Sequence, residues 1–316
     1  MKNPNRSEST DWPDLPFADW SDTVSTLHLW TQIAGKIRLS QTPWTNHSWH
    51  VPLYVTTRGL TTSPIPYGGR SFEINFDFLD HQLIIQSSNG EQRSVSLEPR
   101  SVSDLYEGVL ESLHELDLNI NIYTTPSEIP NAIPFELDNE HHHYDAEYAT
   151  RFWRALVQID RVLKEFRARF IGKCSPVHFF WGSFDLAVTR FSGREAPPHP
   201  GGVPNFPDWV AREAYSHEVS SAGFWPGGGG VDSAAFYSYA YPAPDGFSKS
   251  SVKPDDVFWS EELGEFVLPY HKVQSATSPD EVLLDFLQST YIAAAELGGW
   301  DRAALERDLV PVARSE

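Results

Sequence analysis

The chain has 316 residues, of which 40% are hydrophobic and 13% aromatic, and its formal net charge at pH 7 is −19. This length suits one large domain or two of ordinary size, and the apolar content is enough for a buried core. The acidic balance argues against nucleic acid or an anionic membrane as a partner. No apolar run is long enough to cross a bilayer, and the polar start does not resemble a signal peptide.

The cysteine content of the chain also bears on its cellular compartment. Cys174 is the only cysteine, which excludes internal disulfides and a metal cage built from several cysteines. Together these features predict a cytoplasmic protein, while the oligomeric state is left open.

The first elements in chain order are a polar start, a helix and a group of strands. Residues 1–11 are expected to be disordered, because little in them offsets the entropy cost of ordering. Ser21 or Asp22 can cap a helix that runs to about residue 39, and a strand is expected at 51–57. The clearest strand spans 72–78, where apolar and acidic or amide side chains alternate.

Two more strands, a helix and a closing strand complete the first part of the chain. The strands are expected at 83–86 and 95–97, with an Asn89-Gly90 turn between them. A helix starting at Ser101 follows, and residues 120–123 predict a further strand.

The second part begins with the longest predicted helix, at 145–170, with Asp145 as its N-cap. Its large apolar residues recur every three or four positions, which predicts one buried face. Strands are expected at 177–181 and 186–191, around Val219, at 236–241, and in a hairpin through Phe258 and Val267. A last helix begins with a capping box at Ser278 and ends at Gly298-Gly299.

The order of elements is similar in the two parts. We therefore predict an α+β fold of two similar halves, each an antiparallel sheet with flanking helices, at residues 12–140 and 141–308, followed by a tail at 309–316. Gene duplication is one explanation of the pattern, and chance recurrence of α+β elements is the other. The halves can also merge into one domain.

Four segments carry a family resemblance. They are Ile171-Gly172-Lys173-Cys174-Ser175-Pro176-Val177-His178-Phe179-Phe180-Trp181-Gly182-Ser183-Phe184-Asp185, Leu27-His28-Leu29-Trp30-Thr31-Gln32, Arg58-Gly59-Leu60-Thr61-Thr62-Ser63-Pro64 and Tyr215-Ser216-His217-Glu218. With them the chain resembles a bacterial family of unknown function over about residues 12–305. That family has no assigned activity, so the resemblance implies no chemistry. It has small residues where His142 and His143 stand, which argues against a shared role for those two.

Several well-marked motifs are missing from the sequence. The glycine run at 227–230 lacks the Lys-Ser/Thr of a phosphate loop and is interpreted as a flexible connector. There is also no G-x-G-x-x-G, G-x-S-x-G or H-E-x-x-H pattern. We therefore expect no nucleotide, dinucleotide or other organic cofactor.

The histidine run at 141–143 and Cys174 could each have a functional or a structural role. The run His141-His142-His143 has metal-binding side chains, but adjacent side chains diverge and the segment lies in a polar loop, so solvated histidines are the favoured interpretation. Cys174 has Lys173 beside it and His178 nearby, yet this spacing fits no known nucleophile motif, and a buried small hydrophobe is favoured.

The candidate site rests on ionisable residues within strongly apolar strand sequence. The predicted catalytic residues are His178, His217, Glu218 and Asp185, and the predicted substrate-binding residues are Arg58, Arg190, Arg194 and His50. Charged groups placed among buried strands need a partner, so they indicate either a ligand pocket or a network of structural ion pairs. If a pocket forms, we expect the six residues of the second half to line it together, with His50 or Arg58 arriving from the first half.

From this set we predict a small-molecule enzyme without an organic cofactor. A histidine would act as general acid or base, oriented by Asp185 or Glu218, and the arginines would hold an anionic substrate. One alternative is a non-catalytic binding or sensor protein that uses the same cavity. Another is a mononuclear metalloenzyme with His178 and His217 among its ligands.

Overall fold

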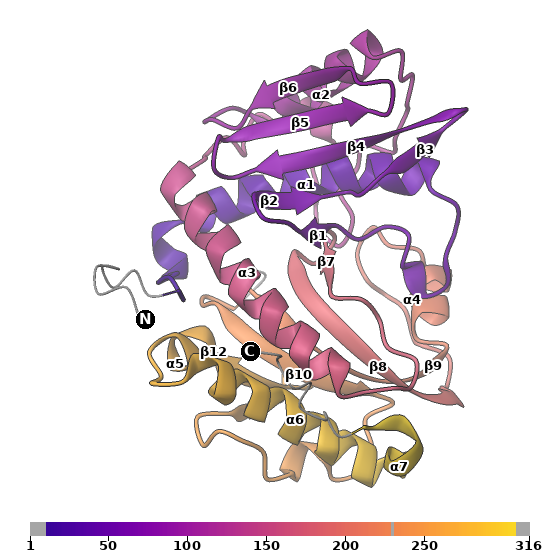
Figure 1. The fold of residues 1–316 in the computed structure, drawn as a ribbon, viewed down its shortest axis with the longest axis vertical. Helices are drawn as coiled ribbons and strands as arrows, with labels where there is room; N and C mark the ends of the chain where they lie inside the picture. The colour runs from indigo at the N-terminus through magenta and orange to yellow at the C-terminus, as the bar shows by residue number, and fades with distance from the viewer. Residues whose placement is uncertain (1–10, 229–230, 308–316) are drawn as a thin grey trace, which may run out of the picture.

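The computed structural model describes residues 11–228 and 231–307 (Figure 1). It contains two antiparallel sheets of six strands each, with helices packed against both. This confirms the predicted α+β class and is consistent with two similar halves. The expected disorder at 1–11 and the tail at 309–316 lie almost wholly outside the described residues.

The first sheet is a meander in the order β1-β2-β4-β5-β6, in which β3 also pairs with β4. Its alternating apolar side chains, such as Phe72, Ile74 and Phe76, are buried. The strands are β1 (Tyr54–Val55), β2 (Gly59–Thr61), β3 (Ile65–Tyr67), β4 (Arg70–Asp77), β5 (Gln82–Ser87) and β6 (Gln92–Ser96).

The second sheet has the order β11-β12-β10-β9-β8-β7. Its first four strands form a meander like that of the first sheet. The sheets differ at one edge, where β12 pairs with β10 and β11 lies outside it. The strands are β7 (His178–Phe180), β8 (Asp185–Glu195), β9 (His217–Trp225), β10 (Ala235–Tyr241), β11 (Phe258–Ser260) and β12 (Glu265–Pro269).

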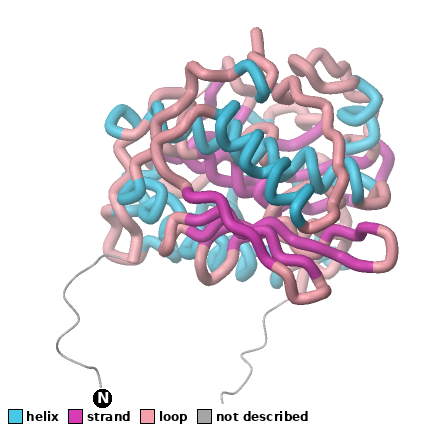
Figure 2. Tube along the Cα trace, turned by 90° about the horizontal axis from the view of Figure 1, so that it is seen from above, coloured by secondary structure: helices cyan, strands magenta, loops and turns pink. Residues whose placement is uncertain are grey.

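The helices lie beside the strands, and long loops run between them (Figure 2). The α-helices are α1 (Ser21–Gln41), α2 (Val102–Glu115), α3 (Ala146–Ala168), α4 (Asp208–Ala214), α5 (Tyr270–Gln274), α6 (Pro279–Leu297) and α7 (Arg302–Leu305). Single 3-10 turns occur at Phe17–Asp19, Asn46–Ser48, Phe135–Leu137 and Phe247–Lys249. In the described part of the chain, none of the helices has the length and hydropathy needed to cross a membrane.

Helix α3 is the core helix that the sequence predicts. Asp145 caps it by accepting hydrogen bonds from the backbone N–H groups of Glu147 and Tyr148. Its apolar stripe, which includes Phe152 and Ile159, is fully buried against α6 and β8. The helix therefore covers one face of the second sheet, as the stripe requires.

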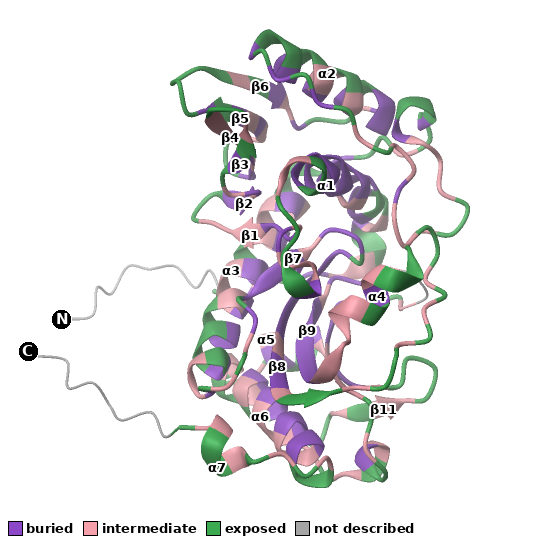
Figure 3. Ribbon diagram, turned by 90° about the vertical axis from the view of Figure 1, so that its right-hand side faces the viewer, coloured by how far each residue is buried: buried purple, intermediate pink, exposed green. Residues whose placement is uncertain are grey.

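Helix α1 is buried on nearly all sides. Figure 3 shows it in purple along most of its length, between the elements of the first sheet and β7. Gly35 is required at one contact, because a Cβ there would overlap the indole of Trp181. The two sheets are joined next to α1 by backbone hydrogen bonds between Leu53 and Phe179.

Several local expectations are wrong. Residues 120–123 are irregular and form no strand, so their alternating pattern did not predict pairing. The strand expected at 51–57 is reduced to Tyr54–Val55. Neither Ser21 nor Asp22 is the N-cap of α1, which is Trp20, and the Ser278 side chain makes no capping hydrogen bond to α6.

Candidate functional site

A cavity of about 920 Å³ lies on one face of the second sheet. Its floor follows the alternation of strand side chains. Tyr237, Tyr239 and Tyr241 of β10 line the cavity, whereas Phe236 and Ser238 are buried on the opposite side, where β10 contacts α6. One face of this sheet thus belongs to the helical core, and the other is a polar, aromatic surface.

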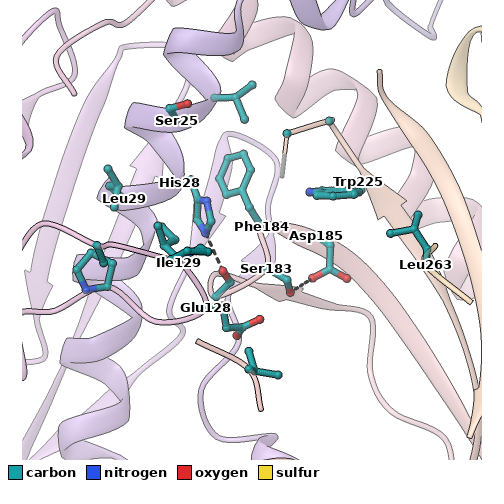
Figure 4. A pocket seen from close by; sticks show the side chains of 18 of the residues that line it. Ser25, His28, Leu29, Glu128, Ile129, Ser183, Phe184, Asp185, Trp225 and Leu263 are labelled. Atoms are coloured by element: carbon teal, nitrogen blue, oxygen red, sulfur yellow. Dashed lines mark hydrogen bonds between the residues drawn. The ribbon is translucent and has the colours of Figure 1, made fainter. Parts of the chain in front are cut away.

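The other walls come from distant parts of the chain. Helix α1 contributes His28, the loop 126–133 contributes Glu128, and the turn between β7 and β8 contributes Ser183. Figure 4 shows these side chains around a common space, with Asp185 beside Ser183. The site is therefore assembled by tertiary packing and not by one motif.

Glu128 is held in the cavity by an uncommon backbone conformation. Its φ of 64° lies in the left-handed region, and its N–H donates a 2.8 Å hydrogen bond to the Pro204 carbonyl. A Cβ at Gly182 would overlap the Oε1 atom of Glu128, so the glycine allows the carboxylate to approach the turn closely. Burial, together with the charge of Asp185, raises the pKa of Glu128 to about 7.

Asp185 is buried at the start of β8, and two hydroxyl groups donate hydrogen bonds to it. It accepts hydrogen bonds from the Ser183 hydroxyl, at 2.5 Å, and from the Tyr237 hydroxyl. Tyr237 has room because Gly223 lies opposite it on β9, where a Cβ would overlap the phenol. Burial raises the pKa of Asp185, and the two hydrogen bonds oppose that shift.

Glu265 is a third acid in the same cavity. Burial and the nearby Asp185 raise the pKa of Glu265 to about 7. Next to it, the hydroxyls of Tyr215 and Tyr239 are hydrogen-bonded at 2.7 Å. Burial raises the pKa of Tyr215 to about 12 and raises that of Tyr239 well above its ordinary value, so both phenols are neutral hydrogen-bonding groups at pH 7.

His28 is a neutral imidazole in the cavity wall. Its Nε2 atom lies 2.8 Å from the Gly182 carbonyl oxygen, which can only accept, so Nε2 carries the proton and Nδ1 the lone pair. The ring stacks on Phe184 at a centroid distance of 5.2 Å. Burial lowers the pKa of His28 to about 4, which keeps the ring uncharged.

The charge of the cavity is one-sided. The acids among its described lining residues are Glu128, Asp138, Glu140, Asp185 and Glu265, and these residues include no Lys or Arg. In the described part of the chain, no group of three His, Cys, Asp or Glu side chains has the geometry to hold a metal ion.

Of the eight site residues predicted from sequence, only Asp185 lines this cavity. His178 is fully buried between the rings of Trp49 and Tyr54, and both its ring nitrogens lack a hydrogen-bond partner among the described residues. Burial, and then the charges of Arg38 and Arg167, lower the pKa of His178 to about 3. This imidazole is closed off from the cavity.

The predicted arginines lie outside the cavity as well. Arg190 is buried on the opposite face of the second sheet, with its guanidinium 3.5 Å from the ring centroid of Phe166 and 4.2 Å from that of Tyr291. Arg194 is paired with Glu218 and donates to carbonyls at the end of α6. Arg58 forms ion pairs with Asp77, at the end of β4, and with Asp80.

The two remaining histidines do not reach the cavity. His217 has a hydrogen bond to the Ser216 hydroxyl, and the next residue along the strand, Glu218, points to the other side toward Arg194. His50 is buried and accepts a hydrogen bond from the Thr45 backbone. The expected pocket, which would join six residues of the second half to His50 or Arg58, is therefore wrong. Adjacent strand positions face opposite ways, and most of these groups are satisfied locally.

The histidine run and the cysteine have local structural contacts. His141 lines the cavity with its Nδ1 atom 2.8 Å from the Asp138 carboxylate, while His142 and His143 stack on each other. Cys174 is half-buried, and desolvation raises the pKa of its thiol to about 11, whereas a nucleophilic cysteine has a lowered pKa. The glycine run is described only at 227 and 228, which line the cavity.

Sequence reasoning missed Glu128, Glu265 and the tyrosines of β10. The tyrosines carried a signal, since Tyr237, Tyr239 and Tyr241 occupy every second position of a predicted strand. Glu128 and Glu265 carried none, because nothing near them in the sequence indicates that they meet.

Comparison with known proteins gives one match. No curated protein and no solved structure matches the chain. A family model described as a family of unknown function covers residues 12–307, almost the whole chain, which confirms the resemblance expected from the sequence. The chain belongs to the family of unknown function DUF5996.

Proposed function

We propose that the protein is an enzyme that transfers protons to or from a small organic molecule, with Glu128 as general acid and base. One observation carries this proposal. The Glu128 carboxylate stands in a cavity of about 920 Å³ without an ion-pair partner among the described residues, and its pKa is raised to about 7. A group that titrates near the working pH can both accept and release a proton during a reaction.

The neighbouring groups fit this role. Asp185 is fixed by Ser183 and Tyr237, so its position relative to Glu128 is well defined. Its charge is one cause of the raised pKa of Glu128 and of Glu265. Pairs of carboxyl groups with separated roles are a common basis of acid–base catalysis, and neutral phenols can stabilise charge that develops on a substrate.

The charge of the cavity guides the choice of substrate. Sequence reasoning favoured an anion held by arginines, but Arg58, Arg190 and Arg194 lie elsewhere. An anion would be repelled by the acids that line the cavity, without a cation to offset the repulsion. We therefore propose a neutral or cationic polar molecule, which the tyrosine rings and hydroxyls can contact.

A screen in D2O tests this proposal while the substrate is still unidentified. The full chain is incubated with pools of neutral compounds, amines and, for comparison, carboxylates and phosphates, and proton NMR follows conversion or deuterium uptake. We expect one neutral or amine compound to change with the wild type and not with Glu128→Gln, because the amide cannot take up the proton.

Other outcomes contradict this function. Conversion that persists in Glu128→Gln would remove the assigned role of that residue. A compound that binds both proteins and changes with neither would favour the binding or sensor alternative. Conversion of anions alone would contradict the proposed charge of the substrate.

A further inference from the structure

Three polar side chains form a stripe along helix α1. His28, Gln32 and Lys36 are spaced by four residues and so lie on one helix face. Gln32 and Lys36 are buried, at 0% and 5% exposure, in a helix whose other buried residues are mostly apolar. Buried polar side chains of this kind are costly unless they make hydrogen bonds, so their partners are informative.

Gln32 forms a two-point contact with the backbone of one residue. Its amide nitrogen donates to the Ser127 carbonyl at 2.9 Å, and its amide oxygen accepts from the Ser127 N–H at 2.8 Å. Lys36 adds a 3.1 Å hydrogen bond from its ammonium group to the Ser127 hydroxyl. Thus α1 holds both backbone polar groups and the side chain of the residue that precedes Glu128.

The same stripe holds the turn that faces Glu128. His28 donates to the Gly182 carbonyl, and Gly182 is the residue against which the Glu128 carboxylate packs. From the other side, the Glu128 N–H is bonded to Pro204. A non-glycine residue in the left-handed region is strained and persists only where its surroundings determine it. Here the contacts on either side of Glu128 supply that constraint.

We propose that the stripe His28-Gln32-Lys36, and above all Gln32, is a positioning device that sets the Glu128 carboxylate in the cavity against the Gly182 turn. Gln32 does not line the cavity. It acts through Ser127 and is a positioning residue. The catalytic importance of this positioning rests on the proposed function. The placement of the Glu128 carboxylate can be measured without an activity assay.

The test uses the full chain with Gln32→Leu and Gln32→Glu. Leucine has a similar size and makes no hydrogen bond, whereas glutamate keeps the acceptor for the Ser127 N–H and loses the donor to its carbonyl. Carbon-13 NMR follows the titration of the Glu128 carboxyl, assigned by comparison with Glu128→Gln. We expect its midpoint to fall by about one unit or more in Gln32→Leu and less in Gln32→Glu, as the carboxylate reaches water. Exchange of the Ser127 amide should become at least about tenfold faster in Gln32→Leu.

Thr290→Val is the matched control. Thr290 is also fully buried in a helix, α6, and its hydroxyl bonds to the Phe286 carbonyl. The control loses a buried hydrogen bond far from Ser127, so it should lower stability without moving the Glu128 midpoint. A merely structural role of Gln32 would give the same result as this control.

The outcomes separate the two proposals. If Glu128 titrates near pH 7 in the wild type and its midpoint is unchanged in both Gln32 variants, the positioning inference is overturned and the proposed function stands. If wild-type Glu128 titrates at its ordinary value, the proposed function fails. In that case hydrogen exchange of the Ser127 amide tests the positioning inference. An unchanged exchange rate in Gln32→Leu overturns the inference. If the leucine variant does not fold, an unchanged rate in Gln32→Glu overturns it.

Discussion

Asp185 and Arg190 lie on the same strand, β8, and face opposite sides of the second sheet. Asp185 lines the cavity, where Ser183 and Tyr237 donate to it. Arg190 is buried in the helical core, where its guanidinium contacts Phe166 and donates to that residue's carbonyl. The strand thus separates the polar cavity from an apolar core in which the Arg190 guanidinium is buried. Substitutions at these two positions should therefore have different effects on stability.

Arg190→Ala should lower the free energy of unfolding by roughly 2–4 kcal/mol, because it leaves a cavity between α3 and α6. Arg190→Met should cost less, since an unbranched apolar side chain fills the space and removes a buried charge. Urea unfolding of both variants checks this. Wild-type stability in Arg190→Ala would contradict the core assignment.

Stability should depend on pH through the cavity acids. The pKa of Glu128 is about 7 in the folded chain and has its ordinary value of 4.5 when unfolded. Between these values the folded chain binds more protons, so stability falls as pH rises from 4.5 to 7. Glu128→Gln removes this contribution and should be more stable than the wild type at pH 8, by on the order of 1–3 kcal/mol.

Urea unfolding at pH 5 and pH 8 measures the difference. Glu111→Gln, on an exposed position of α2, is the control for loss of a negative charge. A Glu128→Gln protein that is less stable than the wild type at pH 8 would show that the carboxylate is stabilised and not strained by its surroundings.

Gly182→Ala should displace Glu128 and leave the fold intact. The new Cβ would overlap the end of a flexible side chain, which can move, and the Gly182 backbone does not need a positive φ. The carboxylate should then reach water, and stability should depend less on pH between 5 and 8 than in the wild type. Gly69→Ala, where a Cβ meets open space, is the control. Identical pH dependence in wild type and Gly182→Ala would argue against the close approach.

Ile159→Asp should prevent folding. Ile159 is fully buried on α3, and an unpaired carboxylate there costs several kcal/mol. Circular dichroism and solubility are sufficient readouts. A soluble variant with an unchanged melting temperature would contradict the central position of this helix.

The sequence predicts elements well where a repeating pattern coincides with burial. The stripe that includes Phe152 and Ile159 marks α3, and the alternation at 72–78 marks β4. The segment 120–123 has a similar alternation but forms no strand, since pairing depends on an available edge that local sequence does not reveal.

The candidate site was harder to predict for the same physical reason. Asp185 was identified because a charge within apolar strand sequence is unusual. Arg190 was grouped with it although their odd spacing places them on opposite faces of a strand, a fact available from the sequence. The position of Glu128 depends on its own left-handed backbone conformation, on the close approach of Gly182, and on the hydrogen bonds between Gln32 of α1 and Ser127. None of these has a local signal in the sequence.

The titration of the Glu128 carboxyl in the wild-type protein is the decisive test of its role as general acid and base. Carbon-13 NMR of the glutamate-labelled chain, with Glu128→Gln to assign the resonance, gives its midpoint without a known substrate. We expect a midpoint near 7, because burial and the charge of Asp185 disfavour the ionised form. A midpoint at the ordinary value of 4.5 would show a solvated surface acid and contradict the proposed acid–base role.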